Sequence, residues 1–136
     1  MKNNESKETA PLYNVSSEKE YKSMDDIFNE SNISGRFVIP GVKNVDWMVP
    51  VAGNGMYPKY SNGDILLCRV VNESFIQWGK VHVIVTKTGL FTRKLKPSSK
   101  ENFVMAETYS DDYPPFDIPK DEIIGLAIVV AAIKFE

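Results

Sequence analysis

Residues with the chemistry of an active site gather in a glycine-rich stretch and in a later basic pair of this 136-residue chain. The stretch is marked by Gly53, Asn54, Gly55, Met56, Pro58, Gly63 and Asp64. The basic pair is Arg93-Lys94, in which a lysine amine can act as a general base but a guanidinium cannot. With a single histidine, His82, and a single cysteine, Cys68, the sequence predicts no metal centre, no cofactor and no internal disulfide.

A phosphate-binding loop is an alternative interpretation of the Gly-Asn-Gly sequence at residues 53–55. Such loops lead into a helix, and no helical pattern follows here. We therefore interpret the two glycines as a tight turn after a strand, where glycine tolerates backbone conformations closed to other residues.

Short runs of β-branched and aromatic residues, separated by turn residues, predict a mainly β domain over residues 33–136. The expected strands are residues 47–52, 64–71, 80–86, 90–96, 102–107 and 122–135. The Lys87-Thr88-Gly89 sequence predicts a hairpin between two of them, because Gly89 can adopt the positive φ that a short loop needs. Residues 1–32 are polar and acidic and are expected to form a linker, with at most one short helix capped by Ser23 and Asp26.

Charge and hydropathy limit the classes of function. The net charge of −2 argues against direct nucleic-acid binding, and the basic residues at 87–100 alternate between strand faces, which favours a solvated surface. The N-terminus lacks the apolar segment of a signal peptide, and the longest apolar run, residues 123–133, is too short to cross a bilayer. We expect a cytoplasmic protein without membrane contact.

The glycine-rich stretch resembles the S24 family of serine/lysine autopeptidases. That family includes the C-terminal domains of LexA-type and phage CI-type repressors and the UmuD-type polymerase subunit. In the family a strand runs into Gly-Asp-Ser-Met, a proline follows, and a Gly-Asp turn opens the next strand. The resemblance continues through residues 79–83, 91–95, 112–115 and 124–125 and covers about residues 36–135. It implies a LexA/signal-peptidase-like fold of strongly twisted antiparallel sheets with a flexible N-terminal tail.

The resemblance implies that the residues for self-cleavage have been replaced. It places Gly55 at the position of the serine nucleophile and Arg93 at that of the lysine base. Lys94 is adjacent, but the one-residue shift that would bring it into place would turn the strand over. The family's Ala-Gly or Cys-Gly cleavage bond is absent before residue 51, where Ser34-Gly35 is the nearest approximation.

The C-terminal run at residues 122–135 is apolar on both faces and would be an aggregation hazard as an isolated edge strand. The resemblance implies dimer contacts in this region, and we expect them at Ile128, Val130, Ala132 and Lys134. The expected function is that of a non-catalytic dimerisation and regulatory domain of a phage-like or LexA-like transcriptional repressor. DNA would be reached only through a helix-turn-helix head, which these residues do not contain.

Two alternatives remain open at this point. The chain is an active autopeptidase that uses Lys94 and an unrecognised nucleophile, or a headless accessory subunit resembling the UmuD type that binds a polymerase or a RecA-like filament. The absence of a head fits either a fragment of a longer repressor or a headless protein.

Overall fold

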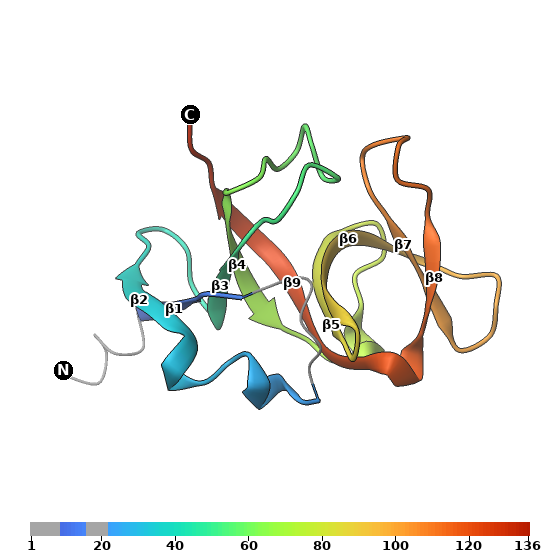
Figure 1. The fold of residues 1–136 in the computed structure, drawn as a ribbon, viewed down its shortest axis with the longest axis horizontal. Helices are drawn as coiled ribbons and strands as arrows, with labels where there is room; N and C mark the ends of the chain where they lie inside the picture. The colour runs from blue at the N-terminus through green and yellow to red at the C-terminus, as the bar shows by residue number, and fades with distance from the viewer. Residues whose placement is uncertain (1–8, 16–21) are drawn as a thin grey trace.

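The computed structural model describes residues 9–15 and 22–136, and its strands form one nine-stranded sheet in the order β2-β1-β3-β4-β9-β5-β6-β7-β8 (Figure 1). The strands are β1 (Thr9–Tyr13), β2 (Ile33–Val38), β3 (Trp47–Pro50), β4 (Ile65–Val70), β5 (Val81–Thr86), β6 (Gly89–Pro97), β7 (Phe103–Glu107), β8 (Phe116–Pro119) and β9 (Ile123–Ile133). Short 3-10 helices lie between them: η1 (Met24–Asp26), η2 (Glu30–Asn32), η3 (Glu73–Phe75) and η4 (Lys120–Glu122). Within the described ranges there is no α-helix, and no helix is long and apolar enough to cross a membrane.

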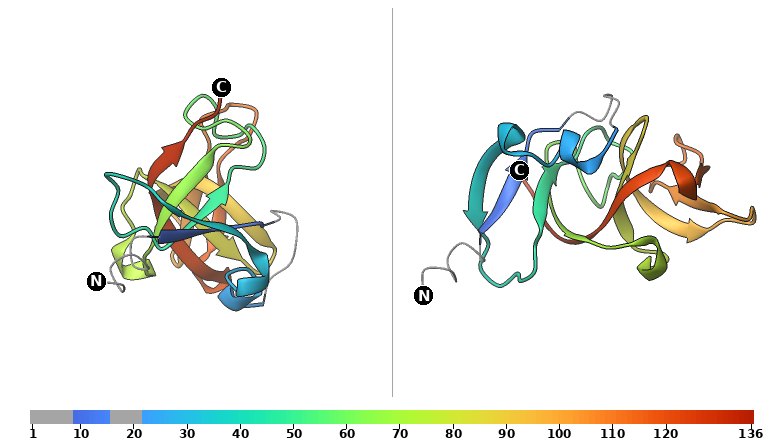
Figure 2. Two further views of the ribbon diagram at one scale, coloured as in Figure 1. Left: turned by 90° about the vertical axis from the view of Figure 1, so that its left-hand side faces the viewer. Right: turned by 90° about the horizontal axis from the view of Figure 1, so that it is seen from below.

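The predicted fold class, mainly β, is confirmed, but the sheet is mixed rather than wholly antiparallel. Strands β1 and β3 run parallel, with Leu12 opposite Met48, whereas the other strand pairs are antiparallel. Figure 2 shows how strongly the sheet twists from one end to the other.

All six predicted strands are present, with ends that differ by a few residues at most. Strands β1, β2 and β8 were not predicted, and β1 lies inside the segment that we expected to be a linker. The short helix expected after Ser23 is confirmed as η1, and the Asp26 carboxylate accepts the Ser23 backbone N–H at 3.3 Å. The remaining parts of the predicted linker, residues 1–8 and 16–21, lie outside the described residues.

The predicted hairpin is also confirmed, with Thr86 of β5 opposite Gly89 of β6. Lys87 and Thr88 form its loop, and Gly89 has a φ of 150°. The Thr86 hydroxyl donates to the Gly89 carbonyl at 3.0 Å and accepts the Thr88 N–H at 3.2 Å. The loop is thus closed by a side chain as well as by the strand ladder.

The C-terminal strand β9 is not an edge strand. It pairs with β4 on one side and with β5 on the other, and it crosses the middle of the molecule in Figure 1. Its aggregation hazard is therefore removed within the chain, because neighbouring strands satisfy both backbone edges.

Strand β5 is buried on both faces. Val81, Val83 and Val85 point into one core cluster and Ile84 into another. From the sequence alone we expect His82 to be at the surface or half-buried, because its side chain falls on the strand face of Lys80 and Ile84. The structure corrects this expectation, since His82 has no exposed surface. Burial follows from the position of β5 between β6 and β9.

Residues 22–32 pack on the core although they contain only short helices. The Phe28 ring stacks on Trp47 with a centroid separation of 4.3 Å and meets Tyr13 edge-on at 5.0 Å. Ile27 is 1% exposed in the same cluster. Aromatic and aliphatic burial therefore fixes this segment against β1 and β3.

Candidate functional site

The glycine-rich stretch forms a turn that connects β3 to β4. Its base is closed by two backbone bonds, from Val51 N–H to Asp64 O at 2.8 Å and from Gly63 N–H to Val51 O at 2.9 Å. Gly53 and Gly63 have φ values of 84° and 93°, so both positions use a conformation that favours glycine. The Asn62 side chain accepts the Gly53 N–H at 2.8 Å.

Two other motif residues anchor the turn. Met56 is 2% exposed and packs into the largest core cluster, and the Tyr57–Pro58 peptide bond is cis. The Asn54 carbonyl accepts the Tyr57 N–H at 3.1 Å. The motif residues thus lie together in one turn, as their spacing predicts.

Gly55 faces the loop between β7 and β8. Its carbonyl accepts the Tyr109 N–H at 3.2 Å, and a Cβ built on it would lie 3.4 Å from Thr108 Cγ2 and 3.7 Å from the Tyr113 ring. These are ordinary van der Waals distances, and the φ of Gly55 does not lie in the left-handed region. The backbone therefore does not require glycine here, and the space around it admits a Cβ atom.

Arg93 lies on β6, opposite His82 of β5. Its Nη1 donates to the Thr92 carbonyl at 2.8 Å, and its Nε is buried without a hydrogen-bond partner among the described residues. Burial lowers the pKa of Arg93, while its interaction with Tyr113 raises it. A guanidinium starts so far above neutrality that it stays protonated and cannot accept a proton. Tyr113 therefore lies beside Gly55 and interacts electrostatically with Arg93.

A cavity of about 290 Å³ lies beside Arg93. Its lining comes from β6, the end of β3 and the segment after β1: Val15, Pro50, Ala52, Leu90, Phe91, Thr92 and Arg93. Sequence reasoning missed Val15 as a site residue, because its segment looked like a linker and nothing local places it near residue 93. Val15 and Arg93 thus line the same cavity, although they are far apart in the sequence.

Lys94 points to other partners than Arg93. Its ammonium lies 3.9 Å from a Glu107 carboxylate oxygen and 4.5 Å from the centre of the Tyr109 ring. Lys96 reaches the same Glu107 oxygen at 3.8 Å. The basic residues of this region are thus largely matched by acids of the same chain.

Asp64 ties the turn to the C-terminal end of the chain. Its carboxylate is 2% exposed and accepts the Ser61 N–H at 2.8 Å, the Lys134 ammonium at 3.2 Å and the Phe135 N–H at 3.4 Å. The Ser61 hydrogen bond contributes most to holding the pKa of Asp64 below its usual value. Lys134 also donates to the Lys59 carbonyl. Lys134, expected at a dimer contact, therefore has a role within the chain.

The four expected dimer residues do not share one face of β9. Ile128 is 5% exposed. A β-bulge opposite Leu67 and Cys68 interrupts the alternation, so Val130 packs beside one core cluster and Ala132 beside another. The different faces of Val130 and Ala132 could not be predicted from the two-residue alternation of a strand, because a bulge leaves no clear signal in an apolar sequence.

The glycine-rich turn begins at the cavity beside Arg93, because Ala52 lines that cavity. The family model described as Peptidase S24-like matches residues 11–130, and the chain belongs to this family, whose domain forms the C-terminal part of LexA and phage repressors. The match begins within β1, ahead of residue 33, where the sequence suggested that the β domain starts. A search of curated proteins finds no match.

Proposed function

We propose that this domain acts in the cytoplasm as the self-associating, regulatory C-terminal module of a repressor and does not cleave itself. The proposal is supported by the chemistry of the two residues that the motif resemblance assigns to the family's reaction site. Gly55 offers no nucleophile, and Arg93 offers a guanidinium where the chemistry needs an amine. Nucleophile and base must both be present for attack by a hydroxyl at neutral pH.

The upstream segment supports the same conclusion. Val15 leads the chain to the cavity beside Arg93, and the sequence that follows is Ser-Ser-Glu-Lys-Glu-Tyr, without an Ala-Gly or Cys-Gly bond. The alternative bond, Ser34-Gly35, lies within β2, where Gly35 pairs with Leu12 of β1. A bond in a strand ladder is poorly placed for attack.

An active enzyme that uses Lys94 is less well supported. The Lys94 ammonium interacts with the Glu107 carboxylate and with the Tyr109 ring. Position 55 itself has no hydroxyl, although Thr108 lies beside it. The proposed partner is accordingly a second copy of the chain, so that two DNA-binding heads reach paired half-sites.

The test combines intact mass with light scattering before and after long incubation at pH 7.5 and pH 10. We expect an unchanged mass at dimer size under both conditions. A clipped product with a new N-terminus would contradict the loss of cleavage, because raised pH deprotonates a lysine base. A monomer at all concentrations would contradict self-association.

A further inference from the structure

Arg93 forms no ion pair with an acid of the described residues. The ion pairs within the described ranges involve other cations: Arg36, Lys94, Lys96, Lys100 and Lys134. The Arg93 guanidinium donates from Nη1 to the Thr92 carbonyl at 2.8 Å, and its Nε is buried without a partner in the described part of the chain. A guanidinium carries several N–H donors in a fixed fork, so much of its capacity to donate is unused.

The surroundings of Arg93 favour an anion. Arg93 is half-buried, and a cation that is withdrawn from water without a counter-ion is costly. Tyr113 interacts electrostatically with Arg93, but a phenol is neutral at physiological pH and supplies no full negative charge. His82, opposite Arg93 in the ladder, has no exposed surface and does not line the cavity beside Arg93. A ligand that enters the cavity therefore meets the guanidinium and not the imidazole.

The cavity of about 290 Å³ gives such a ligand a place. The Arg93 Cζ atom lies 5.8 Å from the centre of the Phe91 ring, which also lines the cavity. Sites for small molecules in proteins are mostly apolar, with a few polar groups that fix the orientation of the ligand. This lining has that character, since Thr92 and Arg93 are accompanied by apolar residues: Val15, Pro50, Ala52, Leu90 and Phe91.

The geometry of the guanidinium selects the kind of anion. Because Nη1 donates to the Thr92 carbonyl, the edge formed by Nε and Nη2 makes no hydrogen bond with a described residue. Two parallel N–H groups of arginine match the two oxygens of a carboxylate, and such bidentate pairs are stronger than single neutral hydrogen bonds. The head group that fits Arg93 is therefore a carboxylate.

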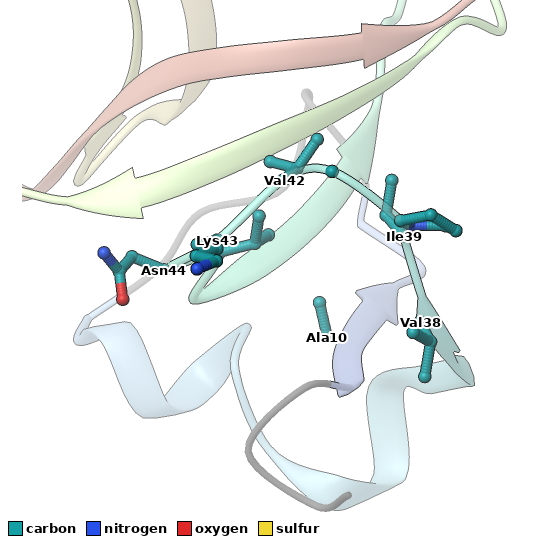
Figure 3. Close-up of a pocket in the computed structure, with 9 residues that line it drawn as sticks. Ala10, Val38, Ile39, Val42, Lys43 and Asn44 are labelled. Carbon is teal, nitrogen blue, oxygen red and sulfur yellow. The ribbon is translucent and has the colours of Figure 1, made fainter. Parts of the chain in front are cut away.

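A second recess, of about 350 Å³, offers different chemistry (Figure 3). It lies between Ala10 and residues 38–45, and Lys43 is its only charged lining residue. The nearby Arg69 guanidinium donates to the Asn44 and Lys43 carbonyls at 3.2 and 3.5 Å, so backbone oxygens occupy it. This recess therefore serves as the internal comparison for binding beside Arg93.

We propose that the cavity beside Arg93 binds a small aliphatic carboxylate. Its head group pairs with the Arg93 guanidinium, and its hydrocarbon part lies among Val15, Pro50 and Leu90. The position that the motif resemblance assigns to the base thereby recognises an anion instead of accepting a proton. The inference goes beyond self-association, because the whole site belongs to one copy of the chain.

The test is a titration with hexanoate, followed by the backbone amide resonances of the ¹⁵N-labelled chain, with hexanamide as the neutral comparison. Hexanoate should shift the resonances of Ala52 and of residues 90–93 and leave those of residues 38–45 in place. Affinity in the millimolar range or tighter is expected of a ligand of this size. Along the series acetate, butyrate and hexanoate, affinity should rise roughly fourfold for each methylene that is buried. Hexanamide should bind more weakly than hexanoate.

Variants test the two parts of the site separately. Arg93→Gln should weaken hexanoate binding roughly tenfold or more, because a charge-assisted pair is lost. Arg36→Gln is the matched control, since Arg36 is exposed on β2 and pairs with Glu30 at 3.0 Å, and it should bind hexanoate like the unmodified chain. Ala52→Leu, at an exposed position of the lining, should weaken binding by filling the cavity. Circular dichroism checks that each variant is folded.

The inference is overturned if hexanoate leaves residues 90–93 unshifted, or if Arg93→Gln or hexanamide binding equals that of the unmodified chain with hexanoate. If Arg93→Gln does not fold, Ala52→Leu decides, because unchanged affinity in this variant also overturns the site. Light scattering on the same samples reports self-association. Failure of the binding site is thus distinguishable from failure of the proposed function.

Discussion

His82 should make the stability of this domain depend on pH between 7.5 and 5.5. The side chain is fully buried, its Nδ1 lies 2.9 Å from the Lys80 carbonyl, and its Nε2 has no hydrogen-bond partner among the described residues. Burial lowers the pKa of His82 in the folded state from its usual value of 6.5. The unfolded chain therefore takes up a proton at a higher pH than the folded chain does, and unfolding becomes easier as the pH falls through 6.5.

The size of this effect follows from proton linkage. For an unfolded pKa near 6.5, lowering the pH from 7.5 to 5.5 costs at most about 1.4 kcal/mol of unfolding free energy, the limit for a folded side chain that stays neutral over the whole range. Asp64, whose folded pKa is also lowered, loses its contribution only as the pH falls below its unfolded value of 3.8. The pH window thus isolates the histidine from this carboxylate.

The assay is urea denaturation at several pH values, with His82→Leu as the comparison. The unmodified chain should lose stability toward pH 5.5, and the variant should lose less over the same range, by up to about 1.4 kcal/mol. The Lys80 carbonyl is not left unpaired in the variant, because it also accepts the Leu95 N–H at 3.2 Å. Equal pH dependence in both proteins would refute the assignment of a neutral buried histidine.

Three further predictions concern the site and its supports. Gly55→Ser combined with Arg93→Lys should cleave a supplied Ala-Gly peptide roughly 10² to 10⁴ times faster than Gly55→Ser alone, measured by mass spectrometry; no cleavage by a folded double variant would show that these positions are wrongly assigned. Gly125→Ala should cost about 1 kcal/mol in thermal unfolding, because its Cβ would lie 1.9 Å from the Met24 sulfur, and adding Met24→Ala should recover most of this loss. Asp64→Asn should speed hydrogen exchange at the C-terminal end of β9, since the carboxylate that holds it becomes neutral; unchanged exchange would mean that the end is held by packing alone.

The sequence predicted the strands with strong local patterns and missed those that depend on distant partners. Strand β1 contains Pro11 and pairs with β2 and, in parallel, with β3, so its only support is non-local. Strand β2 contains Gly35, and β8 is bordered by prolines, which are features that lower strand propensity. These three strands lie at the ends of the sheet, where pairing rather than composition determines the structure.

The part of the candidate site that a local sequence motif encodes could be predicted from the sequence. The part that depends on contacts between distant segments could not. The turn from Gly53 to Asp64 could be predicted because glycine and Gly-Asp spacing encode its geometry. The approach of Val15 to Arg93 could not, since it requires the path of a polar segment across the fold. The burial of His82 was missed because it depends on β9, which is distant in sequence.

The position of strand β9 also limits the order in which the parts of the sheet can form during synthesis. Strands β4 and β5 follow each other in sequence but are not paired; β9 stands between them and joins the group β2-β1-β3-β4 to the group β5-β6-β7-β8. During synthesis on a ribosome, both groups leave the exit tunnel before their connecting strand does. The two groups therefore become one sheet only when residues 123–133 are available, and until then the facing edges of β4 and β5 lack their common partner strand.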